Sequence, residues 1–378
     1  MTMSHTLVDL GWDSHFEQGF ASCREDGLVP GRVSREDRDR YTVWTMDGEV
    51  AANPAGRLRH AALERGALPA IGDWVVLRPS ADGGVGLIEA VLARKSCFSR
   101  KAVRAGGPQY GPGRTEEQVL AANIDTVFLV SGLNEDFNPR RIERYLATAW
   151  DSAARPVVIL NKADICDDVP ARVAEIESTA AGVAIHAMSA TTNQGLEALA
   201  PYLAPGQTVI FLGSSGVGKS TLINRLLGSE RQETREVREV DGRGRHVTTV
   251  REMIVLPEGA VLIDTPGLRE IGLWDDGGGL ERVFNDIAEL AHECRFRDCR
   301  HASEPGCAVK AAIVQGRLDP GRLTNYLKLQ REQAVLAVRR SQRARMNRTT
   351  VRRRPAGTRR RTCPRSRGSR ESPLPQGG

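Results

Sequence analysis

The sequence lacks the features that mark secreted and membrane proteins. It has no run of about 18 apolar residues, so we expect no membrane-spanning helix. Its N-terminus has no apolar signal segment and instead carries Asp9, Asp13 and Glu17, which argues against secretion. Cysteine is sparse: three of the seven cysteines cluster late in the chain. That distribution favours a metal site in a reducing compartment over a disulfide framework, so we expect a cytoplasmic protein.

Lysine is also scarce, with six residues among 53 basic ones, and the positive charge is unevenly placed. The net charge is +6, but residues 339–378 hold 14 Arg and one Glu, a net charge of +13. Residues 1–338 hold 39 basic and 46 acidic side chains, a net charge of −7. The folded body is therefore mildly acidic, and the Arg-rich tail is predicted to be disordered.

A length of 378 residues is enough for two or three domains, and the sequence pattern changes accordingly. Short β-like runs separated by turn signals predict a small barrel near the N-terminus. Later, apolar strand-like runs, among them 156–160 and 208–212, alternate with helical segments, among them 139–150 and 196–203. This alternation predicts a parallel α/β sheet. The predicted parts are an N-terminal extension with a short helix (1–26), a β-barrel (27–98), a mobile linker (99–117), an α/β domain (118–275), a mostly helical domain (276–338) and the tail (339–378).

The α/β domain contains a phosphate-binding motif. Residues Gly213, Ser214, Ser215, Gly216, Val217, Gly218, Lys219 and Ser220 fit G-x-x-x-x-G-K-S between an apolar run and a helical segment, the context the motif requires. The glycines allow backbone N–H groups to surround phosphates, which Lys219 would also reach, and Ser220 would bind Mg²⁺. We expect this loop and the following Thr221 to bind a nucleotide. A Gly-rich turn without a ligand is the less favoured alternative.

A second motif, Asn161-Lys162-Ala163-Asp164, is typical of guanine recognition. The Asp164 carboxylate would accept hydrogen bonds from guanine N1–H and its exocyclic amine, where adenine offers the opposite polarity. The Lys162 stem would cover one face of the base, and Asn161 would brace this loop against the phosphate-binding segment. Taken alone the motif is weak, because Asp164 can equally cap a helix.

Three further elements complete a GTPase set. Ser189-Ala190 fits the segment whose backbone N–H contacts guanine O6. Asp264-Thr265-Pro266-Gly267 fits D-x-x-G, which holds Mg²⁺ through water and senses the γ-phosphate. Thr248 and Thr249 lie where a switch threonine belongs. The base-recognition motifs precede the phosphate loop, so the order is circularly permuted, and the C-terminal domain follows the γ-phosphate-sensing loop directly.

The residue that orients the attacking water is not the usual one. Leu268 stands where Ras-like enzymes have Gln, which predicts slow intrinsic hydrolysis unless another group supplies this function. His246, beside the switch threonines, is our candidate catalytic residue. An exposed loop histidine without a role explains its presence equally well.

The late cysteines form a metal-binding pattern. Cys294, Cys299, His301 and Cys307 offer three thiolates and an imidazole within 14 residues, which suits tetrahedral Zn²⁺ in a closed structural site. Buried, redox-inert thiols are the less favoured alternative.

Together these residues resemble the RsgA/YjeQ family, the circularly permuted GTPases that mature the small ribosomal subunit. The resemblance covers roughly residues 28–338 and rests on the permuted order, the Gly72–Val75 strand, the Gln118–Asn123 segment and the cysteine knuckle. It implies that the barrel is an OB-fold and that the small subunit stimulates a feeble GTPase activity. Val247 replaces the first Thr of the family's G-x-H-T-T-T, which leaves open whether Thr249 or Thr248 binds Mg²⁺.

We therefore expect a monomeric GTPase with GTP, Mg²⁺ and one structural Zn²⁺, which binds rRNA as a late maturation factor of the small (30S) ribosomal subunit. The alternative is a GTP-sensing RNA-binding module with negligible hydrolysis, favoured by Leu268 but disfavoured by the complete set of switch elements. A permuted GTPase of the large subunit fits less well, because the barrel and knuckle match the small-subunit family. The tail is either an rRNA-binding arm or a lineage-specific appendage.

Overall fold

The computed structural model describes residues 5–23, 26–37, 40–61, 65–104, 114–228, 251–264 and 278–352. The chain divides into two compact units, one up to Gln333 and one from Ala334. None of the helices in these ranges is long and apolar enough to cross a membrane.

The predicted barrel is confirmed as a closed five-stranded sheet. It consists of β1 (Val29–Asp37), β2 (Arg40–Thr45), β3 (Gly48–Pro54), β4 (Trp74–Arg78) and β5 (Gly86–Val91). The strand order β1-β2-β3-β5-β4 closes through a β1–β4 pairing, and only β3 and β5 run parallel. Helix α2 (Gly56–Ala61) and the short 3-10 helix η1 (Arg65–Ala67) lie between β3 and β4. This strand order is that of the OB-fold.

The predicted N-terminal extension is part of the hydrophobic core. Helix α1 (Ser14–Ala21) begins after Asp13, whose carboxylate accepts a hydrogen bond from the His15 amide. Phe16 and Phe20, four residues apart, lie on one buried face of the helix. Their neighbour Trp12 stacks edge-on against Trp74 of β4, with ring centroids 4.8 Å apart.

Arg32 of β1 joins this N-terminal segment to the rest of the first unit. The side chain is only 1% exposed. Its guanidinium donates to the carbonyls of Leu10, Gly72 and Asn123 and to the Thr208 hydroxyl at the start of the central strand of the α/β sheet. Burial lowers the pKa of Arg32 to about 10, against the opposing effect of nearby carboxylates. One buried cation therefore satisfies acceptors from four separate segments.

The segment expected to be a linker is ordered in its described part. Strands β6 (Cys97–Arg104) and β7 (Arg114–Ala122) pair antiparallel from end to end, with one register shift between Phe98 and Ser99. Val119, Leu120 and Ala121 of β7 are buried, so apolar burial supports the hairpin. The Gly/Pro-rich stretch 106–113, which suggested a linker, lies outside the described residues.

The α/β part is a six-stranded sheet in the order β10-β9-β8-β11-β13-β12. All strands run parallel except β12, which pairs antiparallel with β13. The strands are β8 (Thr126–Gly132), β9 (Arg155–Asn161), β10 (Ala184–Ala187), β11 (Thr208–Gly213), β12 (Arg251–Val255) and β13 (Val261–Asp264). The central strand β11 leads into the phosphate loop although it comes fourth in the chain, as the permuted motif order predicts.

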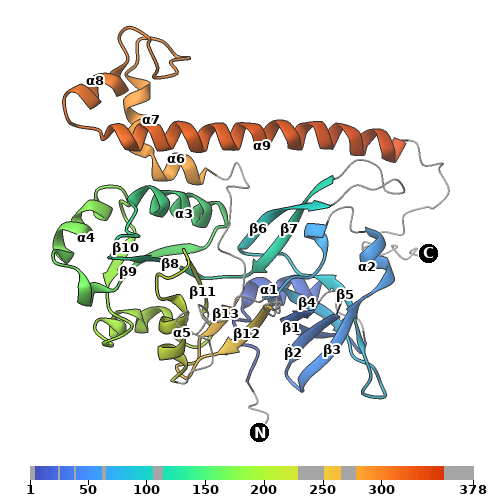
Figure 1. Cartoon of the computed structure of the whole chain (residues 1–378). Helices are drawn as coiled ribbons and strands as arrows, with labels where there is room; N and C mark the ends of the chain where they lie inside the picture. Colours follow the sequence, from blue (N-terminus) through green and yellow to red (C-terminus); the bar gives the residue numbers. More distant parts are fainter. Residues whose placement is uncertain are drawn as a thin grey trace, which may run out of the picture. The chain divides into compact units, whose positions relative to one another are not determined.

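Helices cover both faces of this sheet (Figure 1). Helices α3 (Pro139–Asp151) and α4 (Val169–Glu177) contribute to the core on one face. Helix α5 (Lys219–Leu227) and the 3-10 helix η3 (Leu196–Tyr202) contribute to the core on the other. Successive residues of β8 alternate between the two cores, with Val127 and Leu129 in one and Phe128 and Val130 in the other. Both faces are buried, which explains the uninterrupted apolar run in the sequence.

The barrel and the α/β sheet are hydrogen-bonded to each other. Strand β1 pairs antiparallel with β12, placing Arg35 opposite Glu252 and Glu36 opposite Arg251. The Arg251 guanidinium lies 2.9 Å from the Glu36 carboxylate in a half-buried ion pair. The two parts therefore form one continuous sheet rather than separate bodies joined by a flexible segment.

The C-terminal part is helical, as predicted. It contains α6 (Gly279–Val283), α7 (Asn285–His292), α8 (Ala308–Val314) and α9 (Pro320–Arg352). Helix α9 continues 13 residues beyond Arg339, where the disordered tail was expected to begin. The residues from 339 to 352 contain no Gly or Pro, and the arginines among them are good helix formers, which allows the helix to continue. Residues 353–378 lie outside the described chain.

Candidate functional site: a nucleotide pocket and a cysteine cluster

The phosphate-binding motif has the strand–loop–helix geometry that the sequence predicts. Strand β11 ends at Gly213, and helix α5 begins at Lys219. Gly218 precedes the helix with φ +96°, a conformation that favours glycine. A Cβ at Gly213 would lie against the Val130 carbonyl of the neighbouring strand β8. The backbone conformation therefore requires glycine at position 218, and close packing requires it at position 213.

Polar contacts hold the loop between these ends. Lys219 donates through Nζ to the carbonyls of Gly213, at 2.7 Å, and of Ser214, at 2.5 Å. The Ser214 hydroxyl accepts a hydrogen bond from Arg141 of α3 at 2.5 Å, and Arg141 also lies 2.7 Å from the Asp136 carboxylate. The loop and first helical turn present partly accessible residues to solvent: Ser214, Ser215, Gly216, Gly218, Lys219, Ser220 and Thr221.

Asn161 connects the predicted base-recognition and phosphate-binding segments. Its side-chain amide donates to the Val217 carbonyl at 2.8 Å, and its Oδ1 accepts from the Ala190 amide at 3.0 Å. All three residues are buried. The predicted brace is therefore present, and it holds the three motifs at the carboxyl edge of the parallel sheet, where ligands of such sheets bind.

The rest of the predicted base-recognition loop follows β9. Lys162 adopts a left-handed backbone conformation with φ +68°, which turns the chain sharply after the strand. The Ala163 amide donates to the Met188 carbonyl at 3.0 Å, so the loop lies against the segment that carries Ser189. Ser189 is fully buried, and its hydroxyl accepts from the Thr192 amide, whereas Asp164 is exposed. This arrangement leaves the Asp164 carboxylate accessible to a ligand.

The structure describes only part of the predicted magnesium and switch residues. Asp264 ends β13 beside the phosphate-loop strand β11 and stands opposite Glu252 of β12. Thr249, His246, the rest of the D-x-x-G motif and Leu268 lie outside the described residues.

The four predicted metal ligands come together in the C-terminal part. The ligand atoms of Cys294, Cys299, His301 and Cys307 all lie within 4.8 Å of one another. Cys294 Sγ lies 3.9 Å from Cys307 Sγ and 3.7 Å from His301 Nδ1, and Cys307 Sγ lies 3.5 Å from the same nitrogen. Tetrahedral Zn²⁺, with Zn–S about 2.3 Å and Zn–N about 2.0 Å, requires sulfur–sulfur distances of about 3.8 Å and sulfur–nitrogen distances of about 3.5 Å. The donor set and its spacing therefore fit Zn²⁺.

The pKa shifts of these groups reflect how closely the ligands are packed. Burial lowers the pKa of His301, which favours the neutral imidazole that binds metals. A backbone hydrogen bond from His301 lowers the pKa of Cys299, but burial and the adjacent thiols of Cys307 and Cys294 raise it to about 11. Three thiolates at this spacing repel one another, and a bound cation would remove that cost.

The sheet order, the strand–loop–helix phosphate site and the adjoining guanine-type loop define a circularly permuted GTPase of the P-loop class, with an N-terminal barrel. The family model described as RsgA GTPase matches residues 91–274. The chain belongs to the RsgA GTPase family.

Its relatives match nearly the whole chain. The Small ribosomal subunit biogenesis GTPase RsgA of Opitutus terrae is 49% identical over 343 residues, covering 88% of this chain and 91% of the relative. The protein of the same name from Streptomyces coelicolor is 43% identical over 351 residues, covering 91% and 92%. The crystal structure of YjeQ from Thermotoga maritima superposes with a TM-score of 0.56 at 28% identity, covering 81% of this chain and 98% of that one.

Sequence motifs gave no indication of Arg141. It belongs to no recognised motif and lies 73 positions before Ser214, so only the packing of α3 on strands β8 and β9 brings the two together. The Pro139-Arg140-Arg141 start of a helix carries no signal for a distant partner.

Proposed function

We propose that this GTPase hydrolyses GTP while it acts on the small ribosomal subunit during the late maturation of that particle. The names of the relatives, which are small ribosomal subunit biogenesis GTPases, support this partner. The observation that carries the nucleotide assignment is the pair of buried hydrogen bonds at Asn161, one donated to Val217 and one accepted from Ala190, which align the guanine-type loop with the phosphate loop.

The proposed roles follow from this geometry. GTP lies along the edge of the sheet, with its base on Asp164, Lys162 and the Ser189-Ala190 segment. Its phosphates bind the 213–218 loop and the first turn of α5, with Lys219 supplying positive charge. Ser220, Asp264 and Thr249 of the switch segment would hold Mg²⁺, which would offset the charge of the phosphates, and His246 would orient the attacking water.

The zinc and RNA assignments complete the proposal. Cys294, Cys299, His301 and Cys307 hold one structural Zn²⁺, which supports a short loop-rich segment that has little core of its own. The barrel has the OB-fold strand order, a common scaffold for oligonucleotide binding, and together with the Arg-rich C-terminus it supports rRNA contact. We place the protein in the cytoplasm, as a monomer that binds ribosomal particles.

Multiple-turnover hydrolysis tests this proposal. GTP turnover by the purified chain should be slow alone and rise strongly with small ribosomal subunits, but not with large subunits or with ATP. Lys219→Ala should abolish the stimulated turnover. Tight GTP binding without stimulation by either subunit would instead support a GTP-sensing RNA-binding module. Full activity of Lys219→Ala would overturn the site assignment.

A further inference from the structure

Helix α3 carries side chains bonded to the phosphate loop and others bonded to the C-terminal helices. Four charged residues in the first two turns of α3 contact one or the other of these two regions. Arg141 reaches the phosphate loop, whereas Arg140, Glu143 and Arg144 make contacts with residues of α9 and the segment before it. Residues three and four apart share a helix face, so these last three form one surface toward the C-terminal part.

On the phosphate-loop side, three residues form a chain of short contacts. Arg141 Nη1 lies 2.5 Å from the Ser214 hydroxyl, and the Ser214 carbonyl accepts from Lys219 at 2.5 Å. Asp136 holds the same Arg141 nitrogen at 2.7 Å and fixes its position. The residue proposed to bind the phosphates is therefore two contacts away from α3.

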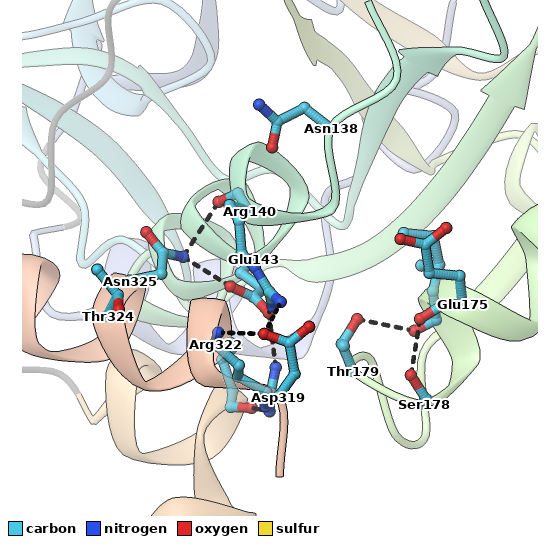
Figure 2. Close-up of polar contacts among 12 residues, drawn as sticks. Asn138, Arg140, Glu143, Glu175, Ser178, Thr179, Asp319, Arg322, Thr324 and Asn325 are labelled. Carbon is cyan, nitrogen blue, oxygen red and sulfur yellow. Dashed lines mark hydrogen bonds and ion pairs between the residues drawn. The ribbon is translucent and has the colours of Figure 1, made fainter. Parts of the chain in front are cut away.

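On the other side, Glu143 accepts three side-chain donors while fully buried (Figure 2). Arg322 donates at 2.8 Å, Asn325 at 2.6 Å and Arg140 at 2.5 Å. Arg322 also forms two hydrogen bonds of 2.8 Å with Asp286 of α7. We call Glu143, Arg322, Asn325, Arg140 and Asp286 the α3 clamp.

The α3 clamp holds the C-terminal helices against α3 by hydrogen bonds and ion pairs more than by close packing. A cavity of about 210 Å³ lies beside it, lined by residues of α3, of the 178–183 loop and of α6 and α7, and by Arg322 itself. Burial alone lowers the pKa of Arg322, but the carboxylates of Asp286 and Glu143 outweigh this effect and raise it. Losing a donor would leave a buried carboxylate underpaired, so the docked arrangement is strongly preferred over small displacements.

We propose that Arg141 is a positioning residue for the phosphate loop and that α3 couples the state of this loop to the docking of helices α6, α7 and the start of α9. This proposal rests on the proposed GTP site. A bound phosphate attracts the Lys219 ammonium and so breaks its hydrogen bond to the Ser214 carbonyl. This changes the conformation of the loop at Ser214, whose hydroxyl Arg141 contacts. Helix α3 transmits this change as a rigid element to Glu143, because both side chains project from the same helical turn.

Hydrogen–deuterium exchange on the full chain tests the coupling. Exchange is measured with Mg²⁺, with and without a saturating non-hydrolysable GTP analogue. In the wild-type protein the analogue should slow exchange in residues 213–221 and also in 280–292 and 320–330. Arg141→Ala should keep the first effect and lose the second. Arg141→Lys, which retains a donor for Ser214, should restore it, and the exposed Arg317→Ala should behave as wild type.

A binding titration gives the reciprocal measurement. Because coupling between two sites is symmetric, Glu143→Gln should weaken the affinity for the analogue by about five-fold or more, whereas Arg317→Ala should not change it. Protection of 213–221 without any change in 280–292 and 320–330 of the wild type would overturn the coupling and leave the GTP site intact. A full C-terminal response in Arg141→Ala would overturn the role of Arg141. No protection of 213–221 would instead refute the nucleotide site itself.

Discussion

Asn161 offers a sensitive test of how the nucleotide pocket is held together. The substitution Asn161→Asp keeps the size of the side chain and an acceptor for the Ala190 amide, but it replaces the donor that faces the Val217 carbonyl at 2.8 Å with a second acceptor. Removing this donor leaves the buried Val217 carbonyl unsatisfied, which costs about 1–3 kcal/mol. That cost corresponds to about 5- to 160-fold in affinity if the whole effect falls on nucleotide binding.

Fluorescent GDP titration measures this affinity, and urea denaturation of the free protein measures how much of the loss falls on stability. Asn285→Asp, which changes an exposed asparagine of α7 in the same way, is the control and should bind GDP as wild type does. Wild-type GDP affinity and stability in Asn161→Asp would refute the bracing role.

The Asn161 side chain also predicts that substitutions at positions 161 and 218 have non-additive effects on GDP affinity. A Cβ at Gly218 would lie against the Asn161 side-chain amide, so Gly218→Ala should weaken GDP binding strongly in the wild-type background. Its effect should be smaller in an Asn161→Ala background, because the obstructing group is gone. Equal effects in the two backgrounds would show that the left-handed backbone at Gly218, not the contact, requires glycine.

Three further outcomes are expected. Arg32→Met should lower the free energy of unfolding, measured in urea, by about 3–5 kcal/mol, because it leaves buried acceptors without a donor and two nearby carboxylates without a cation. The control Arg57→Met, at an exposed arginine, should change it by no more than about 0.5 kcal/mol. Equal stabilities of the two variants would contradict the role of Arg32. Metal analysis should find one zinc per chain, lost in Cys307→Ala but kept in Cys166→Ala; unchanged zinc in both would remove Cys307 from the site. Asp164→Asn should weaken GTP binding about 10- to 100-fold and strengthen binding of xanthosine triphosphate, whose base presents an acceptor in place of the guanine amine; unaltered base preference would exclude Asp164 from base recognition.

Strongly local signals in the sequence predicted most of the nucleotide fold. The structure contains the strands predicted at 156–160 and 208–212 and the helix predicted at 139–150. Each of their ends differs from the prediction by no more than one residue. These segments combine an uninterrupted apolar run or a helical period with turn residues at their ends, so neighbouring residues alone determine them. The helix expected at 196–203 is a 3-10 helix instead, and Pro201 inside it is incompatible with continued α-helical hydrogen bonding.

Prediction from local sequence patterns was weaker where the contacting residues are far apart in the chain. The β6–β7 hairpin was missed because the Gly/Pro-rich residues between its strands resemble a linker, and pairing depends on the register of residues on both sides. The N-terminal residues looked like an appendage, yet Leu10 and Phe16 are almost completely buried. Their burial depends on Trp74 and Arg32, which no local pattern connects to them.

By itself, the sequence determined the chemistry of this protein: a phosphate loop, a guanine-type loop, a permuted order and four zinc-type ligands. Each of these depends on residue identity at short spacing, and such spacing is preserved in any fold that forms the same strand and turn. Only the tertiary structure decided how these parts act on one another. Asn161 meets Val217, Arg141 meets Ser214, and Glu143 meets Arg322 across 56, 73 and 179 positions, respectively. A hydrogen bond across such a separation forms only where the packed sheet and helices place donor and acceptor within about 3 Å, and this placement is a property of the whole core.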